Sequence, residues 1–177
     1  MKYFDEIKKS MEYLAKNKNT VFLGQAVSVP GTAMFNTLKD INNNKKIELP
    51  VAEEMQMGMS LGMALEGYIP VTIYPRWNFL LLATNQLVNH LDKISEISDN
   101  KICPQIIIRT AVGSVRPLDP QSQHRGDFTK AFKQMCNNID IYKITKANEV
   151  FKTYKKVLKN KKRISLVVEI ADFYNEK

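Results

Sequence analysis

Short apolar runs alternate with segments of helical periodicity along the chain, and this alternation restricts the fold more than any other feature. Runs such as "TVFLG" and "PQIIIRTAV" are rich in β-branched residues, which favours strands that are buried on both faces. The expected strands are residues 20–24, 46–51, 69–74, 104–112, 139–144 and 163–170. The expected helices are the N-terminal segment from Phe4 to Leu14 and residues 34–41, 54–66, 79–98, 127–135 and 147–159.

Apolar strands separated by helices predict an α/β fold of three layers, in which helices cover both faces of a mostly parallel sheet. The 177 residues suffice for one domain, and the sequence shows no repeat, linker or second domain. In such sheets a ligand lies beyond the carboxyl ends of the strands. We therefore expect a site near the loops that follow Leu23, Leu49, Ile73 and Ile108.

Composition narrows the classes of partner. The net charge is +8, but the lysines lie at expected helix ends and turns without interleaved aromatic residues, which favours a solvated surface over a nucleic-acid site. Cys103 and Cys136 are too few for a disulfide framework or a metal cluster. No apolar run has the length of a membrane span, and the first helix mixes acidic and basic residues, unlike a signal peptide. We expect a cytoplasmic protein that binds neither nucleic acid nor membrane.

The stretch "LPVAEEMQMGMSLGMALEG", residues 49–67, places two glutamates where a helix is expected to start. A carboxylate in a first helical turn interacts favourably with the helix dipole, by about 0.3–1 kcal/mol. This role explains Glu54 well and Glu53 less well. Gly58 and Gly62 lie one helical turn apart, which would allow close approach of a neighbouring element.

The same stretch carries a family resemblance. Glu53 is followed after four residues by Gly58 and later by Gly62, each glycine preceding a methionine, and this pattern resembles the pyrimidine-domain signature of thiamine-diphosphate enzymes. The chain is most similar to the β subunit of 2-oxoacid dehydrogenase E1 components and to the middle domain of transketolases. The blocks "LPVAE", "GMALEGYIPV", "WNFLLLATNQLVNHLDK" and "PQIIIRT" occur in the family's order, and the resemblance covers residues 20–168.

The resemblance implies roles for four side chains. In the family, the glutamate that Glu53 matches hydrogen-bonds N1′ of the aminopyrimidine ring, and the proton shared there lets the 4′ nitrogen deprotonate thiazolium C2. Glu53 is thus the implied catalytic and cofactor-binding residue. Phe79 matches the aromatic that stacks on the aminopyrimidine, and Trp77 and Tyr74 are expected in the same wall. The alternative is that these aromatics only fill the core.

A second implied catalytic residue is His124, which follows the loop where the family carries an active-site histidine. The loop is longer here than in E1 β subunits, so Gln121 or Gln123 is the alternative for that place. Arg116 and Arg125 are candidate contacts for an anionic group of the substrate.

The family binds the diphosphate and Mg²⁺ through a Gly-Asp-Gly motif in a separate domain, and the sequence contains no such triplet. "RGDF", residues 125–128, lacks the second glycine. We therefore expect residues 1–177 to form a single pyrimidine-binding domain without the diphosphate-binding domain or the C-terminal domain of transketolases. The implied protein is a stand-alone subunit of a split enzyme, active only with a diphosphate-binding partner that holds most of the Mg²⁺ contacts. The simplest assembly is a heterotetramer of two plus two chains.

The implied reaction cleaves or transfers at a carbon next to a carbonyl, in a ketose or a 2-oxo acid. The residues do not choose between transketolase-like transfer and 2-oxoacid decarboxylation. Two rival interpretations stay open. One is a non-catalytic paralogue that acts as a regulatory or scaffolding subunit; the other is an unrelated flavodoxin-like module, although no phosphate-cradling glycine loop is present.

Overall fold

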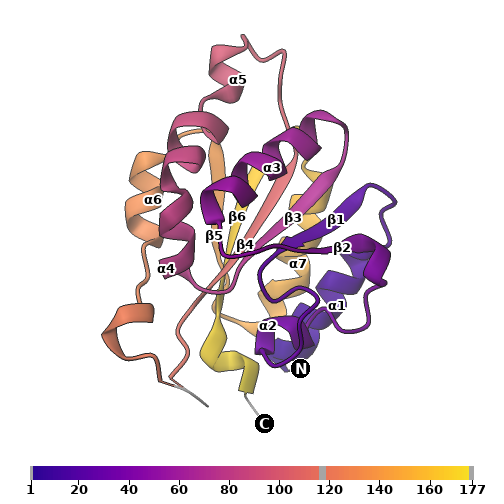
Figure 1. Ribbon diagram of the computed structural model, residues 1–177, viewed down its shortest axis with the longest axis vertical. Helices are drawn as coiled ribbons and strands as arrows, with labels where there is room; N and C mark the ends of the chain where they lie inside the picture. The colour runs from indigo at the N-terminus through magenta and orange to yellow at the C-terminus, as the bar shows by residue number, and fades with distance from the viewer. Residues whose placement is uncertain (1, 116–118, 176–177) are drawn as a thin grey trace.

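A sheet of six parallel strands runs through the middle of the molecule, in the order β2-β1-β3-β4-β6-β5 (Figure 1). The computed structural model describes residues 2–115 and 119–175. Each expected apolar run contains one strand, and β2 is shorter than its run because Pro50 has no N–H for a strand ladder. The strands are β1 (Thr20–Gly24), β2 (Lys46–Glu48), β3 (Ile69–Tyr74), β4 (Ile106–Val112), β5 (Ile139–Lys143) and β6 (Ile164–Ile170).

Helices cover both faces of this sheet, so the expected three-layer α/β fold is confirmed (Figure 1). The long helices are α1 (Tyr3–Ala15), α3 (Glu53–Leu65) and α7 (Ala147–Lys159), and the shorter ones are α2 (Ala33–Asn36), α4 (Trp77–Leu80), α5 (Ile94–Ile97) and α6 (Thr129–Met135). Single turns of 3₁₀-helix are η1 (Asn43–Lys45), η2 (Leu81–Ala83), η4 (Gln121–His124) and η5 (Ala171–Asn175), and η3 (Gln86–Leu91) is a π-helix. None of the helices within the described ranges is long and apolar enough to cross a membrane.

Two apolar cores flank the sheet. Successive strand residues point to opposite faces, so Ile106 and Ile108 of β4 join one core while Ile107 joins the other. The first core also receives side chains from α3, α4, η3 and α6, and the second receives those of α1 and α7. Burial on both faces explains why the strands are apolar at nearly every position.

The helix expected at residues 79–98 is wrong as a single element. The chain instead forms α4, η2, η3 and α5 in succession, beginning at Trp77. Asp92 accounts for the change, since its side chain is buried and accepts the N–H of Asn138 at 2.7 Å, while its carbonyl accepts the Asn138 amide at 2.8 Å. This anchor to the start of β5 diverts the helical ladder, and the Asp92 N–H donates to Leu87, five residues back. The helix expected at residues 34–41 is likewise reduced to α2.

A buried ion pair links β4, β6 and the surrounding helices. Arg109 and Glu169 are both fully buried and meet through two bonds, Nε to Oε1 at 2.7 Å and Nη2 to Oε2 at 2.9 Å. The hydroxyls of Tyr154 and Tyr174 donate to the same carboxylate, and Arg109 Nη1 donates to Thr37 at 2.9 Å. Because both charges are paired and hydrogen-bonded, the cost of burying them is offset only while every partner is present.

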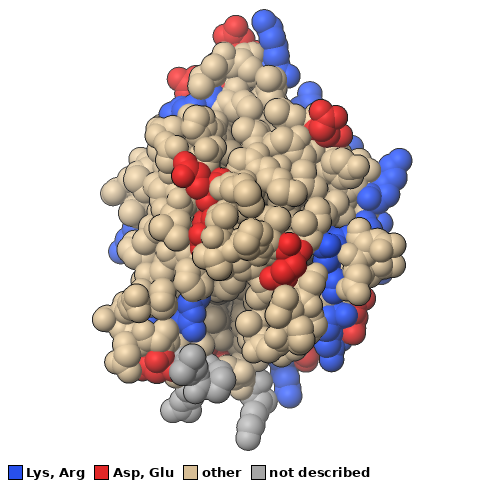
Figure 2. Space-filling model, in the orientation of Figure 1, with Lys and Arg blue, Asp and Glu red and all other residues tan. Residues whose placement is uncertain are grey.

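Charge is distributed unevenly over the surface. Figure 2 shows that the face over α3 carries few Lys or Arg side chains, whereas these gather along the side formed by α1 and β2. The apolar residues Met55 and Met59 of α3 are exposed on the surface.

Candidate functional site

Glu53 is the first residue of α3, just beyond the carboxyl end of β2. Its side chain is only 3% exposed. Gln25 Nε2 donates to Glu53 Oε1 at 3.0 Å, and the Tyr74 hydroxyl donates to the Glu53 carbonyl at 3.2 Å. Within the described part of the chain, no group donates a hydrogen bond to Glu53 Oε2. The carboxylate is therefore held by one oxygen and has the other available for a ligand.

The loop that delivers Gln25 is held by Glu48, the last residue of β2. The Glu48 carboxylate accepts three backbone N–H groups, those of residues 26–28, at 2.6–2.8 Å. Backbone donors converging on one carboxylate fix a loop that has no regular ladder of its own. Glu48 thus orders the segment that follows β1.

Gly24 sets the position of this loop relative to β3. It has φ +135°, and a Cβ there would lie 2.3 Å from the carbonyl oxygen of Ile73 and 2.7 Å from Gln56 Nε2. A larger residue is excluded on both counts. The close approach brings the residue after β1 next to the start of α3, where Gln25 meets Glu53.

The neighbouring glutamates differ sharply in environment. Glu54 is exposed, and its Oε1 accepts a hydrogen bond from Asn85 Nδ2 at 3.1 Å. Glu53 is buried at the carboxyl edge of the sheet. This arrangement agrees with Glu54 as a helix-start residue and Glu53 as the functional one, although the role of Glu53 stays a prediction.

Phe79 and His124, named separately from the sequence, lie together in the structure. Their ring centroids are 5.1 Å apart with a tilt of 46°. Phe79 belongs to α4 and His124 ends η4, so two distant segments meet here. Nδ1 of His124 is buried and has no hydrogen-bond partner among the described residues. The described part of the chain therefore supplies no hydrogen bond to this buried nitrogen.

Sequence reasoning missed Arg76, which precedes α4. Its Nη1 donates to the carbonyls of Gly113 at 2.7 Å and His124 at 3.2 Å, so it ties α4 to the loop after β4. Partial burial lowers the pKa of Arg76, while Asp172 and Asp119 oppose that effect. Across residues 2–115 and 119–175, no carboxylate forms an ion pair with this guanidinium. The sequence feature that could have identified Arg76 is its position just after the end of a strand.

Trp77 and Tyr74 are placed differently from Phe79. Both are fully buried, and the Trp77 ring packs against Phe132 at 4.9 Å and Phe128 at 6.3 Å. Burial also raises the pKa of Tyr74. Neither side chain reaches the surface of this chain, which favours the core-filling alternative for both, and their contact with a cofactor stays a prediction.

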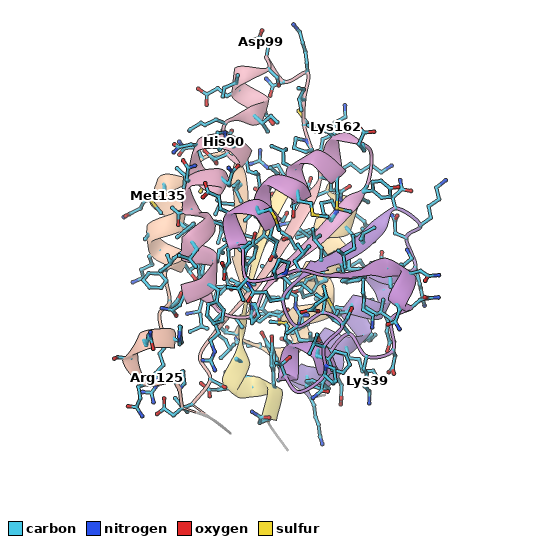
Figure 3. The ribbon with its side chains drawn as sticks, viewed as in Figure 1. Lys39, His90, Asp99, Arg125, Met135 and Lys162 are labelled. Carbon is cyan, nitrogen blue, oxygen red and sulfur yellow. The ribbon has the colours of Figure 1, made fainter. Side chains whose placement is uncertain are left out.

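The remaining candidates lie around η4. Gln121 and Gln123 are exposed. Arg125 is exposed, too, and its Nε donates to Asp119 Oδ1 at 2.8 Å, so its charge is already paired. Figure 3 shows Arg125 at the end of the molecule where the carboxyl ends of the strands lie. Arg116 lies outside the described residues.

Comparison with known proteins finds relatives among the E1 β subunits of 2-oxoacid dehydrogenases. No protein-family model matches the chain. The pyruvate dehydrogenase E1 component subunit beta of Gracilaria tenuistipitata var. liui is 29% identical over 127 residues, which are 69% of this chain and 39% of that subunit. The resemblance to thiamine-diphosphate enzymes is confirmed. This chain therefore spans about two fifths of the length of that relative.

Solved structures support the three-layer α/β fold. A structure described as "Split gene transketolase, inactive beta4 tetramer" matches with a TM-score of 0.69 and 16% identity, over 96% of this chain and 51% of that one. The transketolase of Campylobacter jejuni subsp. jejuni NCTC 11168 matches with a TM-score of 0.72 and 15% identity, over 93% of this chain and 25% of that one. At these identities the likeness establishes the fold alone.

The side chains at the carboxyl edge of the sheet are chemically compatible with one end of thiamine diphosphate. Oε2 of Glu53, the partly exposed ring of Phe79 and Nδ1 of His124 are suited to an aminopyrimidine and to polar atoms near it. For the diphosphate and Mg²⁺ end, the described ranges hold no group of three or more His, Cys, Asp or Glu side chains arranged to bind a metal ion.

Proposed function

We propose that this chain is the pyrimidine-binding subunit of a split thiamine-diphosphate enzyme that acts at a carbon next to a carbonyl, in a ketose or a 2-oxo acid. The observation that carries the proposal is Glu53. A buried carboxylate at the carboxyl edge, fixed through one oxygen and open at the other, is suited to share a proton with a ring nitrogen. The E1 β and transketolase relatives support the same class of chemistry.

We assign a different role to each of the side chains at this site. When bound, thiamine diphosphate supplies a nucleophilic carbon at thiazolium C2 and then an electron sink. Glu53 Oε2 holds the proton at N1′ of the aminopyrimidine, and Gln25 keeps that carboxylate in place. Phe79 offers its ring face for stacking, and the partly exposed ring of His124 exchanges a proton or hydrogen bond with a substrate oxygen.

Arg76 is the proposed contact for an anionic substrate group. It lies beside His124, is partly buried and forms no ion pair with the residues that the structure describes. A 2-oxo acid carries a carboxylate and a sugar phosphate carries a phosphate, and a guanidinium binds either one. Arg76 is better placed for this than Arg125, whose charge is paired with Asp119.

A partner subunit is proposed for the diphosphate and Mg²⁺. The sequence has no Gly-Asp-Gly triplet. On α3, a Cβ at Gly62 would meet nothing within 4 Å, and Met55 and Met59 are exposed beside it, so this helix face is open to a neighbouring subunit. The description of one similar structure as a split-gene transketolase supports a two-chain enzyme, which we propose to be a two-plus-two heterotetramer.

The two glutamates give a matched test. Glu53→Gln keeps size and helix propensity but cannot exchange the proton, so hydrogen–deuterium exchange at C2 of cofactor bound to the assembled enzyme should slow by about 10²–10⁴-fold. Glu54→Gln should leave exchange unchanged, because its loss is limited to a helix-dipole interaction of about 0.3–1 kcal/mol. NMR of the quenched cofactor measures the rate. Equal rates for Glu53→Gln and wild type would refute the assignment and favour a non-catalytic paralogue.

A further inference from the structure

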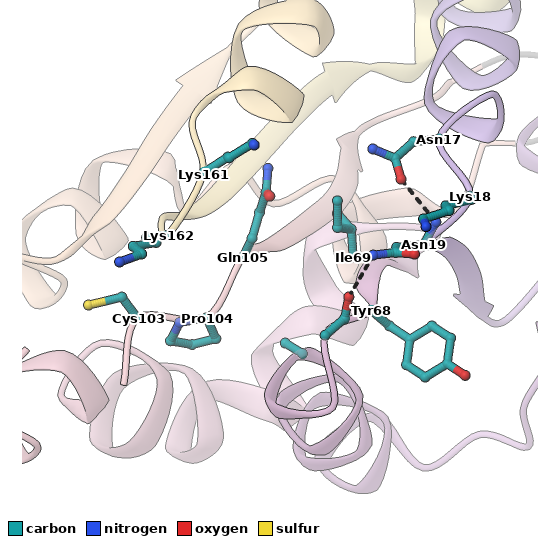
Figure 4. A pocket seen from close by; sticks show the side chains of 12 residues that line it. Asn17, Lys18, Asn19, Tyr68, Ile69, Cys103, Pro104, Gln105, Lys161 and Lys162 are labelled. Carbon is teal, nitrogen blue, oxygen red and sulfur yellow. Dashed lines mark hydrogen bonds between the residues drawn. The ribbon is translucent and has the colours of Figure 1, made fainter. Parts of the chain in front are cut away.

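A cavity of about 500 Å³ lies at the amino edge of the sheet, opposite the candidate site (Figure 4). In Figure 3, Lys162 at this edge and Arg125 near the candidate site lie toward opposite ends of the molecule. The six residues of β3 alone separate the two edges by about 20 Å. The cavity is framed by the turn between α1 and β1, the turn between α3 and β3, the segment before β4 and the turn between α7 and β6.

The cavity is positively charged. Lys18, Lys161 and Lys162 line it, and its lining includes no Asp or Glu. None of the three lysines forms an ion pair with a residue in the described ranges. Lys18 lies on one side of the cavity and Lys161 and Lys162 lie on the other (Figure 4). Like charges that share a cavity repel one another, and an anion bound between them removes that repulsion.

The frame of the cavity is fixed by hydrogen bonds between the turns. Asn19 Nδ2 donates to the Gly67 carbonyl at 3.1 Å, and the Asn19 carbonyl accepts the N–H of Ile69 at 2.9 Å. On the other side, Gln105 Nε2 donates to the Leu158 carbonyl at 2.9 Å. These bonds fix the backbone of the turns that carry the lysines.

We propose that this cavity binds a small polyphosphate anion, with its phosphates between Lys18 and the pair Lys161 and Lys162. Lysine binds phosphate as a compact point charge that adapts to different geometries. Tyr68, which is 48% exposed, and Pro104 also line the cavity and offer apolar surface to an organic group attached to the phosphates. This site does not depend on the proposed catalytic function.

Cys103 lines the cavity and supplies a reporter for the chain alone. Cys136 is buried, and burial raises its pKa to about 11, so it reacts slowly and serves as an internal reference. Alkylation of Cys103 by iodoacetamide, a neutral reagent, is followed by mass spectrometry at increasing tripolyphosphate or ATP. We expect saturable slowing of Cys103 alkylation at constant ionic strength.

Matched variants decide whether the protection is local. A triple variant with Lys18→Gln, Lys161→Gln and Lys162→Gln should raise the half-protecting concentration at least tenfold. A control with Lys133→Gln, Lys152→Gln and Lys155→Gln removes the same charge from exposed positions of α6 and α7 and should leave it unchanged. Tighter binding of ATP than of tripolyphosphate supports contact of the organic group with Tyr68 or Pro104, and equal binding supports a phosphate site alone. The proposal is overturned if Cys103 is not protected. It is also overturned if both triple variants lose protection equally, because that result indicates an adventitious ion only.

Discussion

At the scale of single residues, the candidate site depends on donors that leave one atom of each functional group free. Gln25 occupies Oε1 of Glu53 and leaves Oε2, while Arg76 binds the carbonyl of His124 and leaves its ring. Both donors come from segments far from their acceptors in the chain. Such contacts orient a reacting group without using the atom that reacts.

Phe79 gives a prediction at this scale. Its ring is partly exposed and contacts His124, so Phe79→Ala removes a stacking surface while leaving the buried Trp77 core intact. If Phe79 stacks on the aminopyrimidine, the loss of about 0.5–1.5 kcal/mol corresponds to roughly two- to twelvefold weaker cofactor binding in the assembled enzyme. Titration of cofactor into the complex measures this. An unchanged affinity in a folded complex would remove the stacking role from Phe79.

At the scale of elements, α3 carries both the proposed catalytic residue and the proposed contact face for a partner subunit. Its first residue is Glu53, and its exposed face carries Gly62 and Met59. Glu53 and the exposed face belong to one helix. A subunit that docks on this face therefore also sets the distance from Glu53 to the diphosphate and Mg²⁺ site proposed for the partner.

Substitution of Gly62 should have opposite effects on the stability of the isolated chain and on its assembly with a partner. Gly62→Met should stabilise the isolated chain by roughly 0.5–1 kcal/mol, because glycine is a poor helix former and nothing lies within 4 Å of the added Cβ. The same variant should weaken assembly, because its side chain occupies the space into which a neighbouring subunit packs. Thermal unfolding and sedimentation measure the two effects.

A control for this variant is Lys155→Met, which adds an exposed methionine to α7 instead. It should leave assembly unchanged. Assembly that is equally tight with Gly62→Met would show that this face of α3 does not contact a partner.

Local patterns predicted most elements but not all. The segment "IPVTIY" forms β3 from end to end, and α7 spans the expected residues 147–159, because a continuous apolar run and an apolar helical periodicity are both local signals. The π-helix at Gln86–Leu91 was not predicted, since it depends on a contact between Asp92 and Asn138, 46 positions away. Gln25 was missed for the same reason: its bond to Glu53 crosses 28 positions.

At the scale of the whole molecule, the proposed division of the cofactor site predicts dependence on a second chain. Purified alone with thiamine diphosphate and Mg²⁺, the protein should show no turnover and weak cofactor binding, because no described cluster of side chains is suited to the metal. Addition of a chain that carries Gly-Asp-Gly should restore turnover and form a two-plus-two complex by native mass spectrometry. Turnover by the single chain would contradict the proposal.

The buried pair of Arg109 and Glu169 has a consequence for synthesis on the ribosome. Arg109 is made well before Glu169 and Tyr174, so a nascent chain that stops between them holds a guanidinium whose buried site has no counter-charge. An unpaired buried charge is strongly unfavourable, and β4 lies beside β6 in the sheet. We therefore expect the sheet to close around Arg109 only after β6 has left the exit tunnel.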